Sequence, residues 1–167
     1  VYRSGKIVSK MATITDITPQ KRAEALLARR EAHLSAIIEN QPGMAWLKDM
    51  EGRFLAVNQK FVNACGLKNP KEVIGKTDLD IWSRELAKRY IEDDKRTMRT
   101  RRSIMVEEPI SDRGNRKWFE TFKTPVLNSE GKVLGTSGYA RDITERKWAE
   151  ERIRESERLH ASLIQSL

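Results

Sequence analysis

Few side chains in this sequence are suited to catalysis. Both histidines fall outside residues 42–144, and Cys65 is the single cysteine, so neither an internal disulfide nor a cysteine-built zinc site is expected. Nucleophilic catalysis needs a histidine or a poised acid close to the nucleophile. Asp78 and Asp80 flank a predicted helix start, where carboxylates stabilise exposed amides and the helix dipole. We therefore expect no catalytic activity, and the spacing of the acids predicts no metal site.

Lys123 is the other side chain that could do chemistry. Strand alternation over 116–126 puts Phe119, Thr121 and Lys123 on one face, although alternation alone does not decide which face is buried. A buried ammonium is costly unless it is paired. An inward Lys123 would therefore contact an acid such as Glu107 or an anionic ligand. The favoured alternative is that Lys123 extends to the rim of the core, with its ammonium in water.

Charge and hydropathy restrict the class of protein. The net charge is +8, but the acidic residues of 92–94 directly precede the basic residues of 95–102, so opposite charges fall three and four apart on a helix. This pattern indicates a self-paired, solvated helix face, and no nucleic-acid partner is expected. The sequence lacks a run of about 18 apolar residues. It predicts a cytoplasmic domain, whose parent protein could carry a membrane anchor elsewhere.

One sequence pattern occurs twice, 126 residues apart. Asp16-Ile17-Thr18 and Asp142-Ile143-Thr144 each follow a Gly-Lys pair and each precede a charged segment. Repeats of this kind indicate an array of similar units. The predicted division is residues 1–18 as the C-terminal hairpin of a preceding unit, 19–41 as a linker helix, 42–144 as a complete domain, and 145–167 as a C-terminal signalling helix leading to a next unit.

The complete domain should contain two strands, several short helices and then three strands. This order is typical of an α+β fold with one antiparallel sheet that helices cover on one face. Asn58 is placed to cap a short helix, and Ser83 a longer one. The predicted strands are 44–49, 53–57, 103–110, 116–126 and 132–142, and the longer helix is 84–100.

Both linker helices carry a coiled-coil seam with polar interruptions. The seam positions are 23, 27, 30, 34, 37 and 41 in the first helix and 149, 153, 156, 160, 163 and 167 in the second. They predict a homodimer through the linker helices. An interrupted seam allows more than one register and suits a switched helix, but a spacer helix that only dimerises explains it equally well.

The ordered set of motifs resembles PAS sensor domains, here as a PAS/PAC repeat. It comprises Asn58 and Phe61 before Gly66, the segment 72–78, the segment 118–125, and Asn128, Gly131, Gly135 and 142–144 before a charged helix. The resemblance implies a sheet of order 2-1-5-4-3, with helices over a cavity that can hold a small molecule. It also implies tandem units within a bacterial histidine kinase or diguanylate cyclase.

The resemblance and the strand pattern together suggest which residues form the site. Asp142, Ile143 and Thr144 should relay the signal, and Thr144 is expected to cap the outgoing helix. Asp78 stands where flavin photosensors of the family have a reactive cysteine, and 42–144 offers no histidine for haem, so both cofactors are disfavoured and the cofactor stays unknown. The candidate pocket residues are Trp46, Phe61, Cys65, Ile74, Trp82, Tyr90, Glu107, Phe119, Thr121, Lys123, Thr136, Gly138 and Ala140.

The expected function is that of a sensory and dimerisation module, which relays small-molecule or conformational signals through its C-terminal helix. Its partners would be a second copy, neighbouring PAS domains and an output domain of the same chain. Two alternatives stay open at this point. One is a ligandless structural spacer, and the other is a docking domain that uses the outer sheet face around Trp118, Phe122, Tyr139 and Arg141.

Overall fold

The computed structural model describes residues 2–3, 6–7, 17–112 and 115–165, which form two compact units, Val1–Leu34 and Ser35–Leu167. The first unit holds an antiparallel pair, β1 (Tyr2–Arg3) and β2 (Lys6–Ile7), and most of helix α1 (Thr18–Glu39). The hairpin predicted over residues 1–18 falls largely outside the described residues. The division into four segments therefore stays a prediction.

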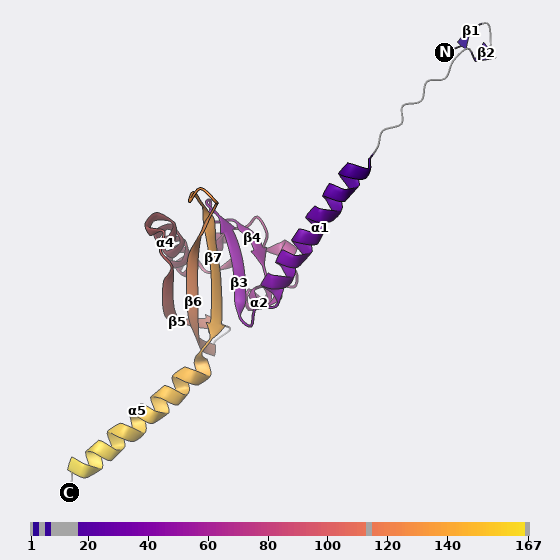
Figure 1. Cartoon of the computed structure of the whole chain (residues 1–167). Helices are drawn as coiled ribbons and strands as arrows, with labels where there is room; N and C mark the ends of the chain where they lie inside the picture. Colours follow the sequence, from indigo (N-terminus) through magenta and orange to yellow (C-terminus); the bar gives the residue numbers. More distant parts are fainter. Residues whose placement is uncertain (1, 4–5, 8–16, 113–114, 166–167) are drawn as a thin grey trace. The chain divides into compact units, whose positions relative to one another are not determined.

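The second unit is built on a five-stranded antiparallel sheet (Figure 1). Its strand order is β4-β3-β7-β6-β5, which is 2-1-5-4-3 in the numbering of the domain and confirms the predicted topology. The strands are β3 (Met44–Asp49), β4 (Phe54–Val57), β5 (Ile104–Asp112), β6 (Asn115–Leu127) and β7 (Val133–Asp142).

Short helices connect β4 to β5. They are α2 (Gln59–Ala64), the 3-10 turn η1 (Pro70–Glu72), α3 (Asp78–Ile81) and α4 (Arg84–Thr100), and α4 packs against β6 and β7. Asn58 caps α2 as predicted, because its Oδ1 accepts from the amide of Phe61 at 3.0 Å. The same side chain joins the helix to β3, since it also accepts from the Ala45 amide and donates to the Gly43 carbonyl. Asn58 therefore fixes the end of α2 to the sheet.

The apolar core lies where α2 and η1 cover the β3–β4 end of the sheet. Phe54, Val57, Phe61, Val62 and Val73 form a buried cluster. The rings of Phe54 and Phe61 are 5.1 Å apart and tilted by 54°, a favourable aromatic geometry. This core stabilises the β3–β4 part of the sheet. The part formed by β5, β6 and β7 makes other contacts, among them those with α4.

Helix α1 buries none of its residues, and α5 (Thr144–Gln165) is exposed over most of its length. Leu34 and Ile37 of the predicted seam are 62% and 60% exposed, and Ile153 of α5 is 60% exposed. Within the described residues, neither helix buries the apolar residues of its predicted seam, although the first turns of α5 contact the sheet. Over the part of the chain that the structure describes, no helix is long and apolar enough to cross a membrane.

Candidate functional site

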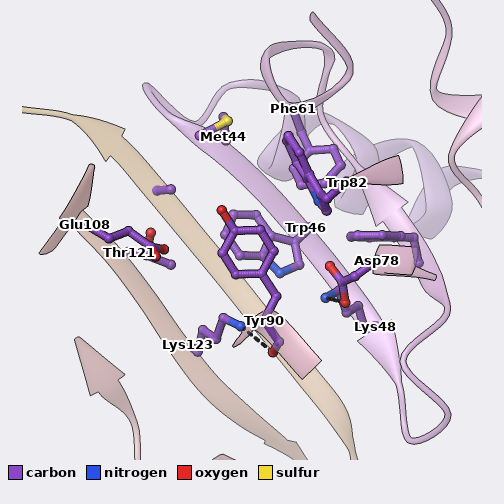
Figure 2. Close-up of a pocket in the computed structure, with 12 residues that line it drawn as sticks. Met44, Trp46, Lys48, Phe61, Asp78, Trp82, Tyr90, Glu108, Thr121 and Lys123 are labelled. Atoms are coloured by element: carbon purple, nitrogen blue, oxygen red, sulfur yellow. Dashed lines mark hydrogen bonds and ion pairs between the residues drawn. The ribbon is translucent and has the colours of Figure 1, made fainter. Parts of the chain in front are cut away.

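A small cavity lies between one face of the sheet, here called the inner face, and the short helices (Figure 2). Its volume is about 30 Å³, which is the scale of one or two water molecules rather than the roughly 300–1,000 Å³ of drug-sized pockets. All five strands contribute to its wall. The lining residues are Met44, Trp46, Lys48, Phe54, Phe61, Asp78, Trp82, Tyr90, Glu108, Thr121, Lys123 and Ala140.

Beside this cavity, Lys48, Asp78, Asp94 and Lys123 form a buried charge network. Lys48 Nζ donates to Asp78 Oδ2 at 2.5 Å and to Asp94 Oδ2 at 2.7 Å. Lys123 Nζ donates to the Tyr90 carbonyl at 2.8 Å and forms an ion pair with Asp94 Oδ1 at 3.0 Å. The angle of this last contact is not that of a hydrogen bond, but attraction between opposite charges does not depend on that angle. Two lysines balance two aspartates, and the four side chains are 2–5% exposed.

The cavity is a desolvated environment, as the pKa directions of its titratable groups show. Burial raises the pKa of Asp78, and the ammonium of Lys48 opposes part of that rise. Burial likewise raises the pKa of Glu108, while Arg89, which donates to its Oε2 at 2.9 Å, lowers it. Desolvation also raises the pKa of Tyr90 above its ordinary value of 10. An additional uncompensated charge would be costly in this environment.

Aromatic rings form much of the remaining wall. Trp82 meets Phe61 and Tyr90 edge to face, with centroids 5.9 Å and 6.0 Å apart. Trp46 lies against Gly138 of β7, where an added Cβ would come within 2.1 Å of the indole. The buried Nε1 of Trp46 has no hydrogen-bond partner among the described residues. A buried donor without an acceptor costs free energy, so its presence beside a cavity is informative.

The structure brings most of the candidate pocket residues together. Trp46, Phe61, Trp82, Tyr90, Thr121, Lys123 and Ala140 line the cavity. Phe119, Thr136 and Gly138 lie on the inner face, paired with Glu108, Lys48 and Trp46 across the ladder. Cys65 instead packs against the apolar core, where burial and then Asp78 raise the pKa of its thiol to about 12. That these residues bind a ligand stays a prediction.

Two candidates were placed wrongly. Ile74 is 43% exposed, because the turn after η1 buries Val73 in its place. Glu107 lies on the outer face of β5, since alternation turns its neighbour Glu108 inward.

The expectation that Lys123 reaches the rim was also wrong. Its side chain is 3% exposed and its acidic partner is Asp94, not Glu107.

Sequence reasoning missed the acids and the lysine that complete the site. The sequence predicts that Asp78 acts as a helix-start carboxylate, but that role belongs to Asp80, whose Oδ2 accepts from the Thr77 amide at 2.7 Å. Lys48 is two residues after Trp46 on the same strand, so alternation could have placed both inward. Met44, Phe54 and Glu108 were missed as well.

The end of β7 is tied closely to the start of α5. Asp142 Oδ1 accepts from the Thr144 amide at 2.9 Å, which lowers the pKa of Asp142 against the effect of its partial burial. The Thr144 hydroxyl accepts from the Trp118 amide of β6 at 2.9 Å, and the Ile143 amide donates to the Trp118 carbonyl at 2.8 Å. The expected role of Thr144 as a helix cap is therefore corrected, because its hydroxyl binds the neighbouring strand.

Ion pairs on the outer face extend this junction into the first turns of α5. Glu107 pairs with Arg146 and with Lys147, the latter at 2.5 Å. Lys147 Nζ also lies 5.3 Å from the centre of the Trp118 ring, and Arg141 Nε pairs with the buried Glu120 at 2.5 Å. Side chains of β5 and β6 therefore contact the first turns of α5, and Arg141 of β7 forms its ion pair next to them.

Parts of known signalling proteins and solved structures are similar to this chain. A segment of the aerobic respiration control sensor protein ArcB of Escherichia coli (strain K12) is 26% identical over 140 residues, which is 83% of this chain and 18% of that protein. A diguanylate cyclase of Vibrio cholerae is 26% identical over 132 residues, 74% of this chain and 40% of that protein. The solved phage VqmA–DPO complex has a TM-score of 0.62 at 25% identity, covering 82% of this chain and 62% of that one.

This chain therefore spans less than half the length of either curated relative. The family model described as PAS fold matches residues 38–147, well over half of the chain. That match covers the sheet, the cavity and the junction with α5. The chain therefore belongs to the PAS fold family.

Proposed function

We propose that this chain is a cytoplasmic PAS module that senses a small molecule and relays its presence through α5 to an output domain of the same protein. The output domain would be a histidine kinase or a diguanylate cyclase, since proteins named as each class occur among the relatives. Phage VqmA was solved as its complex with DPO, which supports a ligand in the cavity of this chain also.

The proposed relay rests on one observation, the position of strand β6. Strand β6 contacts the cavity on its inner face and the β7–α5 junction on its outer face. It can do both because successive side chains of a strand point to opposite faces. Thr121 and Lys123 line the cavity on the inner face. Trp118 holds the start of α5 through its backbone, and Glu120 binds Arg141 on the outer face. A shift of β6 caused by a ligand would therefore move the anchor of the helix.

The dimer belongs to the same proposal. Helices α1 and α5 expose apolar seam residues such as Leu34, Ile37 and Ile153, which a second copy would bury. A homodimer would convert a change at the β7–α5 junction into a change of helix register, which is a recognised form of two-state switching. Sedimentation analysis of the purified chain tests this part directly.

The relay is tested in the parent protein by Asp142→Ala. The variant removes the acceptor of the Thr144 amide, and we expect a folded protein whose output no longer follows the input. Lys117→Ala is the matched control, because it removes only an exposed ion pair with Asp142 at 3.3 Å. We expect the control to respond like the parent. Superimposable dose–response curves for Asp142→Ala and the parent would contradict the relay.

Native mass spectrometry of the purified chain separates a sensor from a ligandless spacer. A small molecule retained at a stoichiometry of about one per chain supports sensing. The docking alternative has less support at Trp118, because the ammonium of Lys147 lies over its ring, although Phe122 of the same face is exposed.

A further inference from the structure

Two neighbouring glutamates of β5 point to opposite faces of the sheet and bind different helices. Glu108 faces inward, where its side chain is 5% exposed and forms part of the cavity wall (Figure 2). Its Oε2 accepts from Arg89 of α4 at 2.9 Å. Glu107 faces outward and pairs with Arg146 and Lys147 of α5, the latter at 2.5 Å. One dipeptide therefore contacts both the helix that covers the cavity and the helix that leaves the domain.

The inner ion pair joins α4 to the edge of the sheet. Helix α4 packs against β6 and β7, and Arg89 reaches from it to the next strand, β5. Among the described strands, β5 pairs with β6 alone, so one side of it is held by no hydrogen-bond ladder. Burial raises the pKa of Glu108, and the guanidinium of Arg89 opposes this rise by favouring the ionised carboxylate. A movement of α4 would therefore pull on β5 at Glu108.

The outer ion pairs act on the direction of α5. Backbone and hydroxyl contacts with Trp118 hold residues 143–144 and so fix the point where the helix begins. A helix that is held at one point can still swing about it. The side chains of Arg146 and Lys147 add a second attachment in the first turn, and two attachments define a direction. Glu107 forms the shortest ion pairs of this second attachment, and the longer contacts come from β6.

We propose that Glu107 and Glu108 form an ionic link between α4 and α5, through which the position of α4 sets the direction of the outgoing helix. One planar peptide unit joins the two residues, so a displacement of Glu108 carries Glu107 with it. The ionic link rests on the proposed relay through α5 and adds a route by β5 to the one by β6. Arg89, Arg146 and Lys147 are then positioning residues of this link.

Residual dipolar couplings of the ¹⁵N-labelled chain measure the direction of α5 relative to the sheet. In the parent chain, the amides of residues 146–150 and those of the strands should fit one alignment tensor. Glu107→Gln keeps the shape of the side chain but removes its charge, and we expect the couplings of α5 to fall by about twofold against those of the sheet as the helix swings.

Glu150→Gln is the matched control. Glu150 contacts the same two cations, Arg146 and Lys147, at 3.7 Å and 3.8 Å, but it belongs to α5 and adds no link to the sheet. The couplings of this variant should fit the tensor of the parent.

Arg89→Met tests the other end of the link. The described ion pair of Arg89 is with Glu108, so a change in α5 has to pass through β5. We expect the couplings of α5 to change in the same direction as in Glu107→Gln, and the double variant to change no more than Glu107→Gln alone. Glu108→Gln breaks the same ion pair without leaving a buried carboxylate unpaired, and it replaces Arg89→Met if circular dichroism shows that the latter does not fold.

Couplings of α5 that stay like those of the parent in Glu107→Gln would overturn the link. A change in Glu107→Gln that neither Arg89→Met nor Glu108→Gln reproduces would also overturn it, since α4 would then have no influence on α5. An equal change in Glu150→Gln would assign the effect to charges within α5 and would have the same consequence. The relay through Asp142 is judged separately by its dose–response curve, so either idea can fail alone.

Discussion

The buried charge network should behave as one unit, and a double-mutant cycle on Asp94 and Lys123 measures this. Asp94→Asn leaves Lys123 with the Tyr90 carbonyl as its remaining acceptor in the described contacts, while Lys48 retains Asp78. Lys123→Met leaves Asp94 paired only with Lys48. Breaking a buried pair by removing one partner costs about 3–5 kcal/mol, because the other charge stays buried without compensation. Each single variant should lose a stability of this order.

The double variant, Asp94→Asn with Lys123→Met, should lose much less than the sum of the two. It removes one negative and one positive charge together, so the remaining Lys48–Asp78 pair stays neutral. We expect a coupling free energy of about 2 kcal/mol or more, which is roughly a 30-fold effect on the folding equilibrium. For a domain of this size, each single variant should lower Tm by about 12–20 °C.

Urea unfolding followed by tryptophan fluorescence is the assay, since Trp46 and Trp82 line the cavity. Arg154→Met is the control, because its ion pair with Glu151 is 4.0 Å long and both side chains are about 70% exposed. It should change the free energy of unfolding by less than about 0.5 kcal/mol. Losses below about 1 kcal/mol in the single variants, or simple additivity in the double variant, would refute the idea of a coupled network.

Three further predictions concern pH, packing and reactivity. In Lys48→Met, the pKa of Asp78 should rise further, because the ammonium of Lys48 lowers it in the parent. An aspartate whose pKa is higher in the folded than in the unfolded state makes the variant more stable as pH falls through the folded-state pKa towards the unfolded value of 3.8. Urea midpoints of the variant should therefore rise between about pH 8 and pH 4, and midpoints that fall over this range would contradict the prediction. Gly138→Ala puts a Cβ 2.1 Å from the Trp46 indole and should cost about 1–3 kcal/mol in thermal unfolding, so an unchanged Tm would be inconsistent with the close contact. Cys65 is half-buried and has a pKa of about 12, so it should react with a thiol reagent at pH 8 much more slowly than an exposed cysteine, and labelling at the rate of an exposed thiol would contradict this prediction.

The sequence was sufficient for the features that depend on local patterns. Asn58 and Ser83 begin helices where predicted, and turn and strand patterns located all five strands of the second unit to within a few residues. The strand order came from the resemblance to PAS domains rather than from the patterns themselves, and the structure confirms it. Local chemistry therefore determined the elements, while their arrangement needed a known family.

The network could not be found in this way, because its members look solvated in the sequence. Asp94 stands between acidic and basic runs and was interpreted as part of a self-paired face. Helix α4 buries Ala87, Asp94 and Thr97 on one stripe. The helical spacing of these residues is present in the sequence, but the charge of Asp94 favours exposure to water. Lys48 and Asp78 are 30 residues apart, and only the folded sheet brings them together. Pairing between distant charges is a tertiary property that periodicity does not encode.

The network also bears on the choice between sensor and spacer. A spacer needs stability, and apolar residues of similar volume would supply it at least as well as four buried charges. The buried charges instead form a network with no net charge beside a largely apolar cavity. One member of the network, Lys123, belongs to β6, the strand whose backbone holds the start of α5 at Trp118. A ligand that disturbs Lys123 therefore acts on the strand that anchors the outgoing helix, which is the arrangement a sensor requires.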